Sequence, residues 1–217
     1  MASTTRPKPS QRANQQKSGR RLPPKVKSGP DIPLLPLIVG GILVATAIVL
    51  IVVAVMNNKP APPPPSADGI TCDQLEHTQT HYHAALQIIH DGVQVNVPTD
   101  IGRLPNCFYW LHMHDESPGV IHIESPKDRT FTLEQFFAVW AASKGTPEPL
   151  DRQHVSTFTL APDEKLYVYI DLNDGKGAQL FDGDPKTIVL KLHEVITLEI
   201  TNGSPTPPPK FTFEAGL

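Results

Sequence analysis

The sequence predicts a mainly β fold: an antiparallel β-sandwich or small barrel with one inserted α-helix at 132–144, preceded by a single transmembrane helix. Three observations predict it. An uncharged apolar run lies near the N-terminus, and about seven short segments downstream have the composition and alternation of strands. A single segment between those strands has helical periodicity and the residues of a capping box.

The apolar run spans residues 34–56. At a rise of 1.5 Å per residue it is long enough to cross a hydrocarbon core of about 30 Å, so the lipid bilayer is its expected partner. A cleaved signal peptide is the alternative. That alternative fits less well, because the apolar run and the basic region before it are both too long.

Charge predicts how the chain is oriented. Residues 1–31 contain eight of the 19 Lys and Arg residues but only one, Asp31, of the 22 Asp and Glu residues. Basic segments stay in the cytoplasm, so we expect a single-pass protein of the cell membrane with a cytoplasmic N-terminus and an extracytoplasmic C-terminal domain. That domain is acidic, which argues against binding to nucleic acid.

Composition divides the chain into five segments. The first segment, residues 1–31, is too polar to bury a core and is expected to be disordered. The third segment, residues 57–68, contains four consecutive prolines, which favour an extended polyproline stalk. The segments are the basic cytoplasmic tail 1–31, the transmembrane helix 32–56, the stalk 57–68, the extracytoplasmic β domain 69–202 and the proline-rich C-terminal tail 203–217.

The strands of the β domain begin with a hairpin. The segments 81–90 and 93–97 are separated by Asp91-Gly92, which is the strongest short signal for a tight turn between two strands. Further strands are predicted at 107–114, 119–124, 165–172, 187–193 and 195–201.

The single helix follows the fourth of these strands. Thr132 and Gln135 have the spacing of a capping box, and Lys144-Gly145 is a typical helix end. The apolar side chains fall on one helical face, which we interpret as a core-packing face. They are Leu133, Phe136, Phe137 and Trp140.

The two cysteines, Cys72 and Cys107, both follow the apolar run. An oxidising compartment makes a disulfide between them the expected state. The alternative is that Cys107 is a thiolate metal ligand, because it lies five residues before His112.

Histidines carry the functional signal. Three pairs of ligand-type residues occur at spacing i, i+2 on predicted strands, which places both side chains of each pair on one face. Two such imidazoles can reach one metal ion at about 2.0–2.1 Å. The predicted ligands are His81, His83, His112, His114 and His122, with Asp115, Glu124 and His193 as orienting or reserve groups.

Five imidazoles exceed the four ligands of a tetrahedral site. We therefore expect at least one of them not to bind the ion directly but to orient the imidazoles that do. By parity, His90 and Met113 should face away from the cluster. With Cys107 oxidised, a blue-copper site is disfavoured. Imidazole and carboxylate ligands favour Cu or Zn, with Fe and Mn as alternatives.

Residues 110–140 resemble a sequence block of uncharacterised prokaryotic membrane-anchored extracytoplasmic proteins. The block has the form WLHxHD, GxIHIESP and FTLxxFFxVW, and an HxH strand with an Asp-Gly hairpin precedes it here at 81–92. The resemblance implies a membrane-anchored domain. It implies no activity, because none is established for that family.

Three functions remain open. The first is a membrane-tethered module that captures, buffers or delivers a transition metal. The second is an accessory or assembly subunit of a membrane complex, in which the histidines are structural. The third is a metalloenzyme in which histidine ligands leave an open position for water. The sequence contains no recognised catalytic motif, which disfavours an enzyme.

Overall fold

The structure is a computed structural model that describes residues 29, 33–57 and 65–217. The chain divides into two compact units, Met1–Ala61 and Pro62–Leu217. The predicted basic tail, apart from residue 29, and most of the predicted stalk lie outside the described residues.

The first unit contains helix α1, Leu34–Asn57. Over Leu34–Met56 it is long and apolar enough to cross a membrane. Within that stretch Thr46 is the one residue with a polar side chain, and its hydroxyl donates to the carbonyl of Ile42 within the helix at 2.8 Å. The polar group is thus satisfied inside the helix, as a hydrocarbon environment requires.

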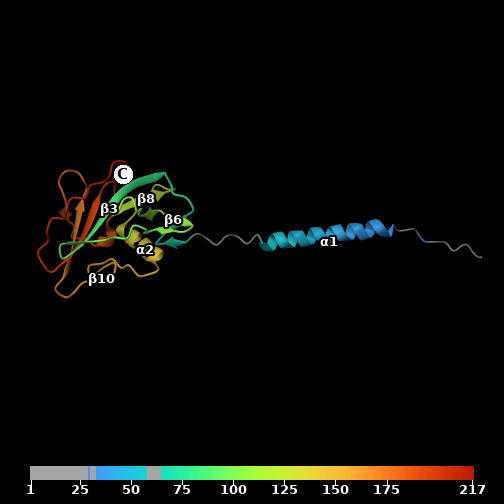
Figure 1. The fold of residues 1–217 in the computed structure, drawn as a ribbon, viewed down its shortest axis with the longest axis horizontal. Helices are drawn as coiled ribbons and strands as arrows, with labels where there is room; N and C mark the ends of the chain where they lie inside the picture. The colour runs from blue at the N-terminus through green and yellow to red at the C-terminus, as the bar shows by residue number, and fades with distance from the viewer. Residues whose placement is uncertain (1–28, 30–32, 58–64) are drawn as a thin grey trace, which may run out of the picture. The chain divides into compact units, whose positions relative to one another are not determined.

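The second unit is mainly β, which confirms the predicted fold class, and its strands form three sheets (Figure 1). The first sheet has the order β1-β2-β6-β5, the second pairs β9 with β10, and the third has seven strands. The strands are β1 Ser66–Ala67, β2 Ile70–Asp73, β3 Thr80–His90, β4 Val93–Val95, β5 Arg103–Leu104, β6 Cys107–Tyr109, β7 Leu111–His112, β8 Val120–Ser125, β9 His154–Val155, β10 Phe158–Thr159, β11 Lys165–Asp171, β12 Gln179–Leu180 and β13 Val195–Thr201.

The seven-stranded sheet has the order β12-β11-β13-β3-β8-β7, with β4 paired to β3. Its pairs are antiparallel except that β13 runs parallel to β3, with Val195 opposite Ala85. This parallel pair joins two distant parts of the chain, and local alternation of side chains could not predict it. None of the sheets formed by the described residues closes on itself, so the architecture is not a barrel.

The predicted helix is α2, Leu133–Lys144. Thr132 and Gln135 form the capping box in both directions, and Gly145 ends the helix in the left-handed conformation with φ 69°. Its apolar face packs into the core, as predicted. A short 3-10 helix, η1 Pro185–Thr187, precedes the segment that pairs with the start of α2.

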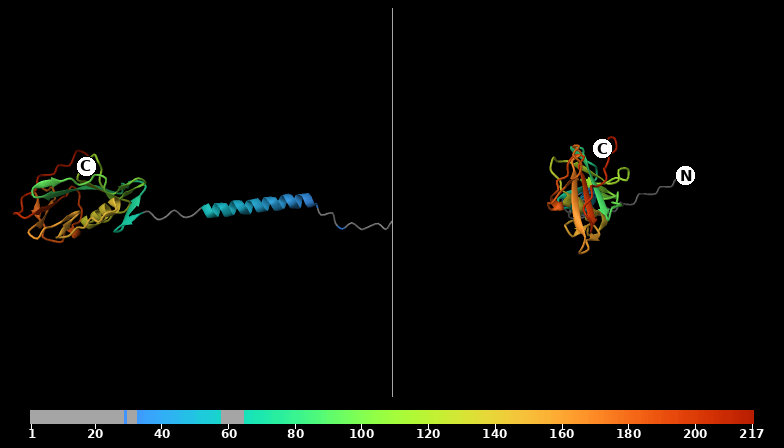
Figure 2. Two further views of the ribbon diagram at one scale, coloured as in Figure 1. Left: turned by 60° about the horizontal axis from the view of Figure 1, so that its bottom comes forward. Right: turned by 90° about the vertical axis from the view of Figure 1, so that its left-hand side faces the viewer.

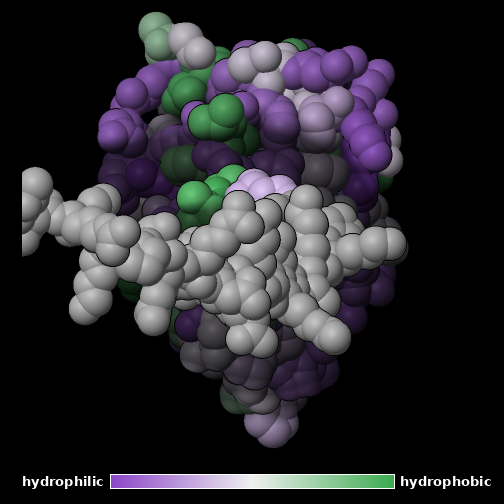
Figure 3. Space-filling model, turned by 90° about the vertical axis from the view of Figure 1, so that its right-hand side faces the viewer, coloured by the Kyte–Doolittle hydropathy of each residue, from purple (hydrophilic) through white to green (hydrophobic). Residues whose placement is uncertain are grey.

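The core lies between α2 and one face of the seven-stranded sheet. Because strand side chains alternate, Ile121 and Ile123 of β8 point into this core and the residues between them point away. The left view of Figure 2 shows α2 (yellow) on one side of β3 (green) and the C-terminal segment (red) on the other. Most of the described residues visible in Figure 3 are hydrophilic.

Cys72 and Cys107 form a disulfide, which confirms the predicted bond. It joins β2 to β6, beside the backbone pair Cys72–Tyr109, with a Cα–Cα distance of 5.4 Å. Because its sulfur is bonded to Cys72, Cys107 is not a thiolate ligand.

The C-terminal segment 203–217, predicted as a tail beyond the domain, makes specific contacts with it. The Thr206 hydroxyl donates to the Glu199 carboxylate at 2.8 Å. The His193 ring donates through Nε2 to the carbonyl oxygen of Leu217 at 2.9 Å. The segment therefore covers part of the sheet face opposite α2.

Candidate metal centre

The histidine pairs lie on three adjacent strands. In the sheet, His83 of β3 is the backbone partner of His122 of β8, and His122 is also the partner of His112 of β7. Cross-strand partners project on the same side of a sheet, so the three imidazoles form a row on the face opposite the core. In the next row, His81 of β3 is paired with Glu124 of β8.

The rings of this row are in close contact. The centroid of the His122 ring lies 4.5 Å from that of His83 and 4.4 Å from that of His114. The rings of His81 and His83 are 4.9 Å apart. All five predicted imidazoles are thus brought into one cluster, and three of them, His83, His112 and His122, are buried.

The orientation of His112 is set by the backbone. Its Nδ1 lies 2.8 Å from the carbonyl oxygen of Tyr109, which can only accept a hydrogen bond, so Nδ1 carries the proton. The lone pair of His112 is therefore on Nε2, which lies 2.9 Å from Nε2 of His114. Two imidazole ligands of one tetrahedral ion are about 3.3 Å apart, so a small movement would accommodate an ion between these nitrogens.

Two carboxylates border the cluster. Glu124 is buried, and its Oε1 lies 3.3 Å from His81 Nε2 and 3.7 Å from His122 Nδ1. Glu76 Oε1 lies 3.6 Å from His112 Nε2 and 3.5 Å from His114 Nε2. Both carboxylates can therefore act as ligands or neutralise a bound cation.

Sequence reasoning missed Glu76, because it lies in an irregular segment between β2 and β3. The signal that could have found it is the disulfide. Cys72 is four residues before Glu76, and its bond to Cys107 holds this segment beside β6 and β7. Sequence reasoning also missed Ser117, whose hydroxyl lies 3.1 Å from His122 Nε2.

Two predicted orienting groups lie outside the cluster. Asp115 accepts a hydrogen bond from Thr99 and pairs with Arg103 at 3.6 Å. His193 approaches His83 only through its backbone, because its N–H donates to the His83 carbonyl at 2.7 Å while its ring binds Leu217. Neither side chain belongs to the groups of potential ligand atoms in the cluster.

Burial keeps two of the imidazoles, His112 and His83, neutral. Loss of hydration lowers the pKa of His112 to about 4, although its hydrogen bond to Tyr109 opposes the shift. Burial, with the nearby His122 and His81, also lowers the pKa of His83 to about 4. Neutral imidazole is the form that binds metal ions, so these side chains are available as ligands at neutral pH.

Glu124, in contrast, is ionised and carries a negative charge. Burial alone would raise its pKa, but the nearby imidazoles of His122, His112 and His81 outweigh that effect and lower it. The cluster therefore combines imidazoles whose pKa is lowered, those of His83, His112 and His114, with an ionised carboxylate. This is a ligand set suited to a divalent transition-metal ion.

The ligand atoms form two overlapping groups in which all atoms lie within 4.8 Å of one another. The larger group contains His112, His114, His122 and Glu124, and the smaller contains His81, His83 and His122. Each group could hold a metal ion. His122 belongs to both.

Comparisons with known proteins give no guidance on function. No protein-family model, no curated protein and no solved structure matches the chain. The functional argument therefore depends on the geometry of the cluster.

Proposed function

We propose that the protein is a membrane-tethered extracytoplasmic module that captures, buffers or delivers a transition metal, with Cu or Zn favoured over Fe or Mn. The observation that carries the proposal is the convergence of His112 Nε2 and His114 Nε2 at 2.9 Å. The Tyr109 carbonyl keeps the proton on the other nitrogen of His112, which is how proteins commonly orient a metal-binding histidine.

The extracytoplasmic location is supported by two independent features. Basic residues are concentrated before the apolar helix, and acidic residues after it. The Cys72–Cys107 disulfide is typical of an oxidising compartment outside the cytoplasm. The acidic domain also attracts cations.

Differences in exposure favour exchange of the ion over permanent storage. His112 is fully buried, whereas the side chain of His114 is 22% exposed and that of Glu76 is 40% exposed. An ion held by these groups would have buried ligands on one side and ligands accessible to a partner or to water on the other. That arrangement suits capture and transfer better than a closed structural site.

The proposal is tested by metal analysis of the full-length protein in detergent, followed by competition titration with Zn²⁺ and Cu²⁺. Substituting His114→Ala should lower metal affinity at least about 100-fold, because it removes an exposed ligand without emptying the core. The matched control is His154→Ala, because that ring pairs with Asp151 at 3.0 Å and lies outside the cluster. We expect the control to bind as the wild type does.

Equal affinities in the two variants, or no bound metal in the wild type, would contradict the proposal. The histidines would then serve structure, and the interpretation as an assembly subunit would be favoured.

A further inference from the structure

One nitrogen of the cluster lacks a partner. Among the residues that the structure describes, His83 Nε2 is the one buried side-chain nitrogen or oxygen without a hydrogen bond. The residue is 7% exposed. Leaving a buried polar atom unpaired is unfavourable, so such an atom calls for a bound group that satisfies it.

The surroundings of His83 supply the donors of a cation site. The ring of His81 lies 4.9 Å away on the same face of β3. The carboxylate of Glu124 is 3.3 Å from His81 Nε2 and so borders the same space. Two imidazoles and a carboxylate are a ligand set for a divalent transition-metal ion rather than for an anion.

The rest of the cluster has a ligand set that does not need His81 or His83. His112, His114 and Glu76 form a compact triad, with ligand atoms 2.9, 3.5 and 3.6 Å apart. Five imidazoles and two carboxylates are more than one tetrahedral ion can use.

The two triads have the same composition and lie on either side of His122. Each consists of two histidines at spacing i, i+2 and one glutamate. The His122 ring is 4.5 Å from His83 in one triad and 4.4 Å from His114 in the other. A neutral imidazole has one lone pair, so His122 can complete one site while it separates the two.

We propose that the cluster binds two transition-metal ions per chain: one at His112, His114 and Glu76, and a second at His81, His83 and Glu124. This inference rests on the proposed function and extends it from one ion to a pair. A protein that holds two ions side by side can release one and retain the other.

The test is the stoichiometry of Zn²⁺ bound to the full-length protein, measured by titration and by native mass spectrometry. The wild type should bind two ions, and His83→Ala and His114→Ala should each bind one. The double variant should bind none. The matched control is His154→Ala, a histidine outside the cluster whose ring pairs with Asp151, and this variant should still bind two ions.

A second measurement uses the wild type alone and needs no variant. Loading the wild type with two equivalents of Cu²⁺ should produce a spin-coupled electron paramagnetic resonance spectrum, because the two ions are neighbours. One equivalent should produce the spectrum of an isolated ion. If His83→Ala does not fold, this measurement still decides the question.

The outcomes separate the two proposals. A wild type that binds one ion, with His83→Ala unchanged, would overturn the second site and leave the proposed function standing. A wild type that binds none would overturn both.

Discussion

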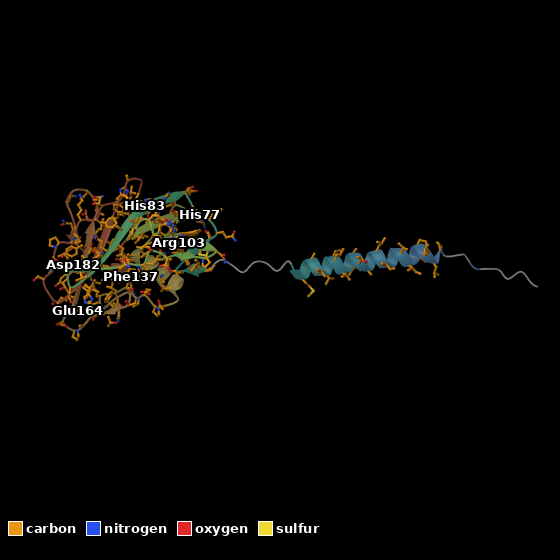
Figure 4. The ribbon with its side chains drawn as sticks, in the orientation of Figure 1. His77, His83, Arg103, Phe137, Glu164 and Asp182 are labelled. Atoms are coloured by element: carbon orange, nitrogen blue, oxygen red, sulfur yellow. A yellow bond between two sulfur atoms is a disulfide. The ribbon has the colours of Figure 1, made fainter. Side chains whose placement is uncertain are left out.

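Strand β3 carries histidines at both of its ends, and their environments differ. At one end, His83 faces His122 across the sheet and His81 faces Glu124. At the other end, His90 is paired across the sheet with Val93, and its ring binds Glu164 at 2.7 Å. Figure 4 shows Glu164 far from His83.

The difference shows that the strand paired with β3 determines which side chains surround each imidazole. Next to β8 and β7, each imidazole meets other imidazoles, and His83 Nε2 is left without a hydrogen bond. Next to β4, His90 meets no second histidine, and Glu164 satisfies its Nε2 directly. The same residue type is thus part of a buried group of imidazoles at one end, whereas at the other it is a single imidazole beside the carboxylates of Asp91 and Glu164, a more exposed group that could also hold an ion.

The largest effect is expected from the disulfide, which holds Glu76 at the histidine-rich end. Replacing both Cys72 and Cys107 with serine should lower the free energy of unfolding by about 3–4 kcal/mol, because the unfolded chain loses its cross-link. Urea unfolding of the metal-free protein measures this change. An unchanged unfolding midpoint would show that packing alone holds β2 against β6.

The next effect is a loss of stability in acid. In the metal-free protein the pKa of His112 is about 4, against 6.5 for an unperturbed histidine, so the unfolded state binds more protons between these pH values. The contribution of His112 to the free energy of unfolding is therefore fully present above pH 6.5. It is lost as the pH drops to about 4, which lowers the free energy of unfolding by about 3 kcal/mol.

Unfolding measured across this pH range checks the prediction. His112→Gln cannot titrate, so its stability should fall less steeply with decreasing pH than that of the wild type. Identical slopes would indicate that His112 is not held neutral by burial.

The smallest effect is expected from replacing a carboxylate near one end of β3, with the carboxylate near the other end as the comparison. Glu76→Gln should weaken metal binding about 10-fold, because it removes a charge 3.5 Å from His114 Nε2. Glu164→Gln removes the partner of His90 and should leave metal affinity unchanged. Competition titration measures both variants, and a matching loss in Glu164→Gln would mean that His90 also takes part in binding.

Local patterns predicted much of this architecture. The period of two in a strand is enough to place His112 and His114 together and to send Met113 into the core, where it is fully buried. The capping box was enough to locate the start of α2 at Thr132. These features depend on residues within one or two turns of the chain, so the sequence carries them directly.

Features that depend on distant pairing could not be predicted in this way. The register that aligns His83 with His122 is set between strands some thirty residues apart in the chain, and no local pattern encodes it. Glu76 reaches the cluster from an irregular segment. The contacts of Thr206 and Leu217 likewise depend on where β13 lies, which the sequence pattern does not specify.

The parallel pairing of β3 with β13 has a consequence for how the domain folds during its synthesis. The strands of the histidine cluster all lie between residues 80 and 125, whereas β13 begins only at Val195. During synthesis, β3 and β8 can pair while β13 is still absent. Until β13 arrives, the second edge of β3 has unpaired backbone groups, which are prone to pairing with other chains. A chain truncated before Val195 should therefore have its histidine-bearing strands present but aggregate through that open edge.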